Sequence, residues 1–262
     1  MKRKITKIYY AFLDIEKAYD TVDRDILWEI LERIGLTEHI RKIIKSMYRY
    51  TVATYNWNGI EIEGVKSERG LRQGCTLSPL LFTLIMEEFT QRIKNKGIGI
   101  KVGEEILSLL LFADDVVLMA ENKEHLQVLL NEAETFSKDI KLNFGIEKCK
   151  VMIINKRQNE NIESEYTLMG RKLEEVEEFK YLGLKINKNG LEGERNKMRS
   201  KAEKMYGIIN GKTNCRVNKY EVIRGLWKGI AVPTIMYGTE IIGIGKKEFC
   251  PTVFCSVNDY RL

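Results

Sequence analysis

The chain has 262 residues, of which 44% are hydrophobic and 31% charged, so it can bury a core and still present a charged surface. Its 43 Lys and Arg residues exceed its 37 Asp and Glu residues, and the net charge of +6 suits either a solvated surface or a polyanionic partner such as nucleic acid. The apolar run near the N-terminus stops at Asp14, too early for a signal peptide, which argues against export. No apolar run in the sequence reaches the length of a membrane span, which argues against a membrane partner. Five scattered cysteines and two histidines favour reduced thiols in an intracellular protein, nuclear or cytoplasmic, and argue against a zinc site.

The first quarter of the chain is predicted to contain a strand, two helices and a hairpin. Residues 7–14 are aromatic and β-branched, as in a buried strand. Asp23 can cap a helix that ends before Gly35, and Thr37 can cap a second, basic helix that reaches Tyr50. Residues 51–66 alternate about an Asn-Gly dipeptide, which favours a hairpin.

The middle of the chain alternates helices with apolar strands. A helix is expected from Ser78, because Pro79 suits its first turn and apolar residues recur every four positions behind it. Residues 107–120 are predicted to form two strands joined at Ala113-Asp114-Asp115, and a helix follows over residues 123–138. Further strands are expected in CKVMII and in FKYLGLKI.

From residue 191 the sequence favours helices rich in Lys and Arg, and residues 246–262 show no periodicity. The order of elements predicts an α+β fold, a palm of antiparallel sheet backed by helices over residues 1–190, followed by a helical thumb-like segment over residues 191–245.

Two adjacent carboxylates, Asp114 and Asp115, interrupt an apolar run. One interpretation is an acidic turn at a hairpin tip, where Asp is common. The other is a tight turn that directs both carboxylates at a hard cation such as Mg²⁺, since burying ionised carboxylates without a cation is costly.

Asp14 is the last residue of an equally apolar strand, and one interpretation is that it only caps the end of that strand. If that strand lies beside the hairpin, three carboxylates converge, and their mutual repulsion calls for divalent metal. Two ions about 3.5–4 Å apart would then activate a hydroxyl and stabilise a leaving oxygen.

The ordered motifs of this sequence resemble those of reverse transcriptases from non-LTR (LINE-type) retrotransposons. FLDIEKAYDTVDRDIL resembles motif A, GLRQGCTLSPLLFTLIME motif B, LLLFADDVVLMA motif C, KLNFGIEKCKVM motif D and FKYLGLKI motif E. PTIMYGTE resembles a segment that recurs downstream of the palm, so the resemblance spans roughly residues 5–245.

The resemblance implies RNA-directed DNA polymerisation, in which an RNA template, a DNA primer and deoxynucleoside triphosphates are the partners. Asp14, Asp114 and Asp115 would bind two Mg²⁺ ions, which Mn²⁺ could replace, and the Ile15 carbonyl would join Asp14 on one of them. Lys148 would act as a general acid on pyrophosphate, or alternatively is a plain surface lysine.

The resemblance also implies nucleotide and primer contacts. Tyr19 would exclude a 2′-hydroxyl, or alternatively fill the core, and the loop of Arg72, Gln73 and Gly74 would meet the nucleotide. The primer end would lie against three residues that otherwise only pack a strand: Tyr181, Leu182 and Gly183. The phosphates of the duplex would meet basic residues that otherwise form a solvated face: Arg195, Lys197, Arg199, Lys201 and Lys204.

Three functions remain open from the sequence. The chain starts just before motif A, so fingers and endonuclease segments are expected in a parent polyprotein, and the chain is either an active polymerase or a catalytically inactive, nucleic-acid-binding remnant that lacks fingers. An RNA-directed RNA polymerase also has a palm with paired acids, but Tyr19 and the FADD context favour deoxynucleotides.

Overall fold

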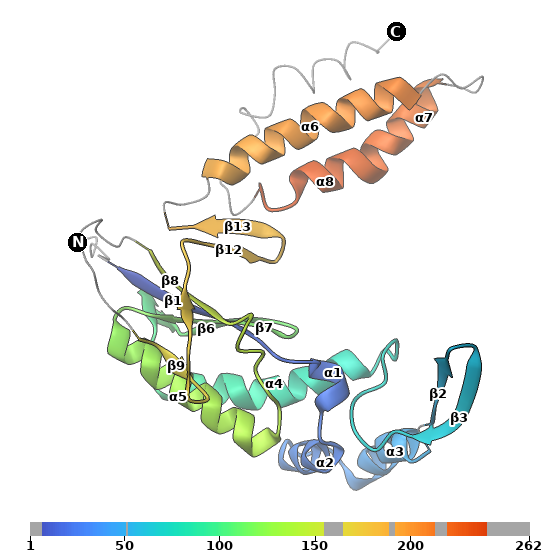
Figure 1. The fold of residues 1–262 in the computed structure, drawn as a ribbon, viewed down its shortest axis with the longest axis vertical. Coiled ribbons are helices and arrows are strands. Elements are labelled where there is room, and N and C mark those ends of the chain that lie inside the picture. Colours follow the sequence, from blue (N-terminus) through green and yellow to red (C-terminus); the bar gives the residue numbers. More distant parts are fainter. Residues whose placement is uncertain (1–6, 51, 155–164, 189–191, 213–218, 240–262) are drawn as a thin grey trace. The chain divides into compact units, whose positions relative to one another are not determined.

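A computed structural model describes residues 7–50, 52–154, 165–188, 192–212 and 219–239 (Figure 1). The chain divides into two units, Met1–Glu177 and Glu178–Leu262. The predicted tail over residues 246–262 lies outside the described residues. No helix in the part of the chain that the structure describes is both long and apolar enough to cross a membrane.

The first unit is built on a five-stranded sheet. Its strands, in spatial order, are β11 (Glu174–Glu175), β8 (Lys150–Ile154), β1 (Ile8–Asp14), β7 (Asp115–Ala120) and β6 (Leu109–Phe112). All neighbours are antiparallel except β11, which pairs with β8 in parallel. The predicted α+β palm, an antiparallel sheet backed by helices, is thus confirmed.

Two long helices, α4 (Ser78–Asn95) and α5 (Lys123–Ile140), pack together, and α5 lies on β1 and β7 (Figure 1). Alternate side chains of β1, among them Ala11 and Leu13, join the same buried cluster as the inward faces of both helices. Phe89 of α4 and Phe136 of α5 meet at the centre, with their ring centroids 4.8 Å apart. This core holds the central strands, and therefore their ends, in place.

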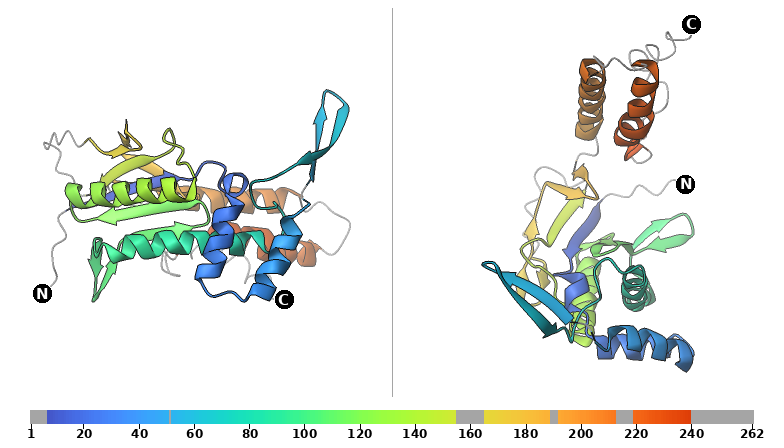
Figure 2. Two further views of the ribbon diagram at one scale, coloured as in Figure 1. Left: turned by 90° about the horizontal axis from the view of Figure 1, so that it is seen from below. Right: turned by 90° about the vertical axis from the view of Figure 1, so that its right-hand side faces the viewer.

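The segments between β1 and α4 add three helices and a hairpin. They are α1 (Ala18–Thr21), α2 (Arg24–Arg33), α3 (Glu38–Tyr48), β2 (Val52–Trp57) and β3 (Ile60–Lys66). Asp23 caps α2 as predicted, accepting hydrogen bonds from the backbone N–H groups of Asp25 and Ile26. The β2–β3 hairpin turns at Asn58-Gly59 and projects from the body of the first unit (Figure 2).

Short hairpins complete the first unit. One consists of β4 (Ile100–Val102) and β5 (Glu105–Leu107), and the other of β9 (Thr167–Leu168) and β10 (Arg171–Lys172).

The second unit contains a hairpin and a group of helices: β12 (Glu178–Tyr181), β13 (Leu184–Asn187), α6 (Glu192–Lys212), α7 (Lys219–Leu226), the π-helix η1 (Trp227–Ala231) and α8 (Val232–Met236). FKYLGLKI, predicted as one strand, is instead a hairpin, because Leu182 and Gly183 both adopt positive φ angles and reverse the chain. The helices share a small core in which Trp227, Ala202 and Ile235 are buried.

Candidate functional site

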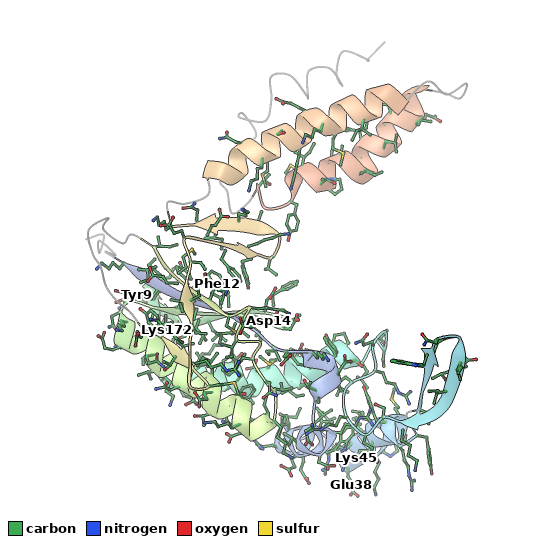
Figure 3. All side chains as sticks on the ribbon, in the orientation of Figure 1. Tyr9, Phe12, Asp14, Glu38, Lys45 and Lys172 are labelled. Carbon is green, nitrogen blue, oxygen red and sulfur yellow. The ribbon has the colours of Figure 1, made fainter. Side chains whose placement is uncertain are left out.

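The central relationship of the site is the pairing of Asp14 with Asp115. Asp14 is the last residue of β1, Asp115 the first of β7, and the two are direct partners in the antiparallel register. Directly opposed residues in such a pair have Cβ atoms about 4.5–5.5 Å apart. Figure 3 marks Asp14 at the end of its strand. The two carboxylates, 101 positions apart in the sequence, are therefore neighbours.

Asp114 lies in the turn that precedes Asp115. Phe112 of β6 pairs with Asp115 of β7, so Ala113 and Asp114 form a two-residue turn. Ala113 has a φ of 54°, in the left-handed region where non-glycine residues are uncommon. Such a conformation costs on the order of 1–3 kcal/mol and persists where the surrounding structure fixes it. Here the paired strands β6 and β7 fix it, and the turn brings Asp114 beside Asp115.

The three carboxylates interact electrostatically. The pKa of Asp115 is raised, first by burial and then by the negative charges of Asp114 and Asp14. A divalent cation would remove this repulsion, and the carboxylate oxygens are the hard donors that Mg²⁺ takes. Within the described residues, however, no group of three His, Cys, Asp or Glu side chains is already arranged to hold a metal ion. The donors therefore fit the metal by type and by place, while their side chains do not yet form a complete ligand set.

Lys148 forms a hydrogen bond with one of the carboxylate oxygens of Asp14. Its Nζ atom donates a hydrogen bond to Oδ2 of Asp14 over 3.1 Å, and this bond is the main cause of a raised Lys148 pKa. The Asp14 side chain is 26% exposed and that of Lys148 71% exposed. The predicted general acid thus lies beside a predicted metal ligand, with its proton favoured.

The backbone around Lys148 is held against the end of β1. The N–H of Gly145 donates to the Asp14 carbonyl over 2.9 Å, and the N–H of Lys148 donates to the Gly145 carbonyl. Ile15, the residue predicted to offer its carbonyl to a metal, is buried and forms an isolated bridge with Phe144. A Cβ atom on Gly145 would lie 3.2 Å from Oδ2 of Asp14, so the absence of a side chain there leaves room for this carboxylate.

Tyr19 is packed on the core of the first unit. Its ring stacks on that of Phe82, with centroids 5.2 Å apart, and its carbonyl accepts a hydrogen bond from the Leu71 N–H over 2.7 Å. The packing role that the sequence offered as an alternative is therefore present. Selection against a 2′-hydroxyl stays a prediction, compatible with this packing.

The predicted nucleotide loop follows directly. The Gln73 amide donates to Oδ1 of Asp20 over 2.9 Å, and the Arg72 guanidinium lies over the Tyr48 ring. Gly74 has a φ of +80°, and nothing lies within 4 Å of the place where a Cβ atom would be. The side chains of Gln73 and Arg72 thus contact other residues of the chain, whereas the backbone at Gly74 leaves space for an approaching group.

Arg24, which the sequence analysis missed, organises the approach to this loop. Its guanidinium is buried, lies over the Tyr48 ring and donates hydrogen bonds to four backbone carbonyls, those of Tyr48, Ser67, Arg69 and Gly70. Burial lowers its pKa. The signal that could have revealed it is a cation in the first turn of a helix, where the helix dipole disfavours positive charge.

Two hydrogen bonds connect Tyr48 to the loop through Ser78. The Tyr48 and Ser78 hydroxyls form a buried hydrogen bond of 3.2 Å, and the Ser78 hydroxyl donates to the Arg72 carbonyl over 2.7 Å. Arg24 and Ser78 therefore fix both ends of the segment that carries Gly70 and Arg72.

Asp23 connects the same region to the segment after α5. Besides capping α2, its carboxylate accepts a hydrogen bond from Lys141 Nζ over 2.9 Å and lies 3.5 Å from the Arg69 guanidinium. The hydrogen bond from Lys141 is the first cause of a lowered Asp23 pKa. One side chain thus fastens segments that are far apart in the sequence.

In the second unit, the three residues predicted to meet the primer form the tip of the β12–β13 hairpin: Tyr181, Leu182 and Gly183. Of the five basic residues predicted to meet phosphates, all lie on α6, and Lys197, Lys201 and Lys204 are exposed and share one stripe of that helix. The side chains of Arg195 and Arg199 lie outside what the structure describes.

Comparison with known proteins shows the family to which the chain is similar. Residues 1–186 match the family described as reverse transcriptase (RNA-dependent DNA polymerase). The chain is 30% identical over 189 residues to the retrovirus-related Pol polyprotein of the type-2 retrotransposable element R2DM of Drosophila melanogaster. It is 30% identical over 197 residues to that of a type-1 retrotransposable element R2 of Nasonia vitripennis. These matches cover 70% and 72% of this chain but 18% and 19% of the relatives, so the chain spans about a fifth of their length.

Solved structures are similar in fold. Telomerase from Candida tropicalis in complex with a fragment of telomeric RNA has a TM-score of 0.51 and 14% identity, over 92% of this chain and 41% of the telomerase chain. Apo telomerase from the same organism also has a TM-score of 0.51, at 15% identity, over 96% of this chain and 43% of the other.

Proposed function

Because the chain belongs to the reverse transcriptase (RNA-dependent DNA polymerase) family, we propose that it is the RNA-directed DNA polymerase domain of a non-LTR retrotransposon polyprotein. The observation that carries the proposal is the pairing of Asp14 with Asp115, with Asp114 in the adjoining turn. Sequence similarity alone would be compatible with a decayed site, whereas this arrangement keeps all three carboxylates at one end of the sheet.

The carboxylates of Asp14, Asp114 and Asp115 would hold two Mg²⁺ ions, joined by the carbonyl of Ile15. When bound, such ions lower the pKa of an attacking hydroxyl and neutralise charge on a departing phosphate group. Lys148 would hold a proton at Nζ, beside Asp14, for the leaving pyrophosphate.

The remaining residues would orient the substrates. Tyr19 would lie beneath the sugar of a deoxynucleotide and leave no room for a 2′-hydroxyl. Gly74 offers open backbone for close approach, and the Gln73 amide would exchange its bond with Asp20 for one with the nucleotide. In the second unit, the Leu182–Gly183 turn would contact the primer, and the lysines of α6 would contact the phosphates of an RNA–DNA duplex.

Primer extension tests the proposal. The chain is incubated with an RNA template, an annealed DNA primer, deoxynucleoside triphosphates and Mg²⁺, and Asp114→Asn is compared with Glu104→Gln. Glu104 is an exposed residue between β4 and β5, so its loss of charge serves as the matched control. Extension by the wild type and the control, with a loss of about 100-fold or more in Asp114→Asn, is expected.

The inactive remnant is the alternative outcome of the same experiment. It predicts salt-sensitive binding of the duplex, unchanged in Asp114→Asn, together with no extension by the wild type. Ribonucleotide incorporation in preference to deoxynucleotides would instead favour an RNA-directed RNA polymerase and would contradict the role given to Tyr19.

A further inference from the structure

The turn between β12 and β13 has a conformation that its own residues do not favour. Tyr181 and Leu184 are register partners, so Leu182 and Gly183 form a two-residue loop with φ angles of +47° and +81°. Two positive φ angles are typical of a type I′ turn, for which Asn-Gly is the common sequence. Leucine is disfavoured at the first of these positions, because its Cβ atom crowds the backbone there. The turn therefore needs support from elsewhere.

Tyr237 supplies that support. It lies in PTIMYGTE, a segment that the proposed function leaves without a role, and it follows directly on α8. Its hydroxyl donates a hydrogen bond to the Leu182 carbonyl over 2.5 Å. Its ring lies against Gly183, where a Cβ atom would come within 3.5 Å of Cε1 of the tyrosine. The tyrosine thus contacts both residues of the turn.

Gly238 packs against the same hairpin. It has a φ of +79°, and a Cβ atom there would lie 2.8 Å from Cδ2 of the buried Leu184. The chain end of α8 is itself anchored, since the Thr239 hydroxyl donates to the Met236 carbonyl and Ile235 is buried in the helical core with Trp227. Tyr237 and Gly238 therefore connect the hairpin turn to the helices of the second unit.

We propose that Tyr237 is a positioning residue whose hydroxyl holds the Leu182–Gly183 turn in the conformation that receives the primer strand. The proposal rests on the proposed function for the role of the turn, whereas the contact between Tyr237 and the turn stands on its own. It gives the tyrosine of PTIMYGTE a task, namely to make the hairpin tip and the thumb-like helices move as one body.

Hydrogen exchange tests the contact without reference to activity. Tyr237→Phe removes one hydroxyl and keeps the ring, and the exposed position of Tyr237 means that the variant should fold. Thr234→Val is the matched control, because Thr234 lies on α8 just before Tyr237 and its hydroxyl donates to the Ile230 carbonyl of the preceding turn. We expect the Leu184 amide to exchange about fivefold faster in Tyr237→Phe and at an unchanged rate in the control.

A double-mutant cycle assigns the effect to the turn. Leu182→Gly removes the unfavourable left-handed leucine, so the turn should need the tyrosine less. Adding Tyr237→Phe to Leu182→Gly should then accelerate exchange at Leu184 by less than twofold. An equal acceleration in both backgrounds would overturn the proposal that the hydroxyl holds this conformation.

Kinetics test the role in primer binding. In Tyr237→Phe, KM for the primer–template should rise about fivefold, while kcat and KM for the nucleotide stay within twofold of the wild type. Unchanged KM for the primer–template would overturn the positioning role. If the wild type neither binds the duplex nor extends the primer, the proposed function fails and the assignment of the turn to the primer fails with it. The exchange rates would then decide only whether Tyr237 holds the turn.

Discussion

The ammonium nitrogen of Lys148 lies 3.1 Å from Oδ2 of Asp14, although the two residues are 134 positions apart in the sequence. Asp14 is also the register partner of Asp115 in the antiparallel pair of β1 and β7. A cation held by the protein and a cation taken from solution would therefore compete for the same carboxylate. Lys148 partly offsets the charge of the carboxylates, and we expect it to compete with a metal ion for Asp14.

Replacement of Lys148 should therefore have two separable effects. In Lys148→Gln, the Mg²⁺ concentration for half-maximal extension should fall about threefold, because Asp14 no longer shares an oxygen with an ammonium group. At saturating Mg²⁺, kcat should fall roughly 100-fold, because the leaving pyrophosphate loses its proton donor. Both values come from primer extension in a Mg²⁺ titration. Lys150→Gln is the control, since Lys150 pairs with Glu174 at the edge of the sheet. An unchanged kcat would reduce Lys148 to a surface lysine.

Asp23 gives a pH-dependent contribution to stability. Its pKa is lowered in the folded chain, mainly by the hydrogen bond from Lys141. A lowered folded-state pKa means that the stabilisation is present above the ordinary pKa of Asp and is lost as the pH falls through the lowered value. Asp23→Asn should keep the helix cap and lose only the charge. We expect it to reduce the free energy of unfolding by about 1 kcal/mol at pH 7 and by progressively less as the pH falls below the ordinary pKa of Asp.

Urea denaturation at several pH values measures this difference, with Asp25→Asn as the control from the same helix turn. The result would be contradicted by a difference between Asp23→Asn and wild type that stays constant from pH 7 to pH 2, since that would point to a lost shape and not to a lost charge.

Replacement of Arg24 should damage both stability and nucleotide binding. In Arg24→Met, the carbonyls of Ser67, Arg69 and Gly70 lose a buried donor, which should cost about 3 kcal/mol of unfolding free energy. In Arg24→Lys, the ammonium group can still donate to some of these carbonyls. This variant should therefore retain roughly half of the stability that Arg24→Met loses. KM for the nucleotide should follow the same order. Arg33→Met, which removes an exposed pair with Glu88, is expected to cost less than about 1 kcal/mol.

The contrast between Asp14 and Arg24 explains how far the sequence could be interpreted. The sequence predicts Asp14 at the end of one apolar strand and Asp114 and Asp115 between two others, because a strand's direction and period follow from its own residues. Arg24 was missed because its partners are backbone carbonyls of a distant loop, whose positions depend on the packed fold. The same limit applies to FKYLGLKI, where Leu182 adopts a left-handed conformation that leucine does not favour and its carbonyl accepts a hydrogen bond from the distant Tyr237. The sequence also could not predict how the carboxylate side chains are oriented, because the Asp14 carboxylate accepts a hydrogen bond from Lys148, which is distant in the sequence.

Gly70 offers a test of how closely the loop before Arg72 must approach α1, the short helix after β1. Its N–H donates to the Val22 carbonyl over 2.8 Å, its φ is +81°, and a Cβ atom would lie 2.7 Å from the Asp20 carbonyl oxygen. Gly103, between β4 and β5, has a φ of +66° and nothing within 4 Å of its Cβ position. Alanine at Gly103 therefore measures the conformational cost alone, about 1 kcal/mol, whereas alanine at Gly70 adds a collision with backbone.

We expect Gly70→Ala to reduce the free energy of unfolding by at least about 3 kcal/mol, measured by urea denaturation alongside Gly103→Ala. The displaced loop should also raise KM for the nucleotide, because Leu71 bonds to the Tyr19 carbonyl and Gln73 to Asp20. If the two alanine variants lost equal stability, the close approach at Asp20 would not constrain the loop. The position of Arg72 and Gln73 would then depend on Arg24, on Ser78 and on the hydrogen bonds of Leu71 and Gln73.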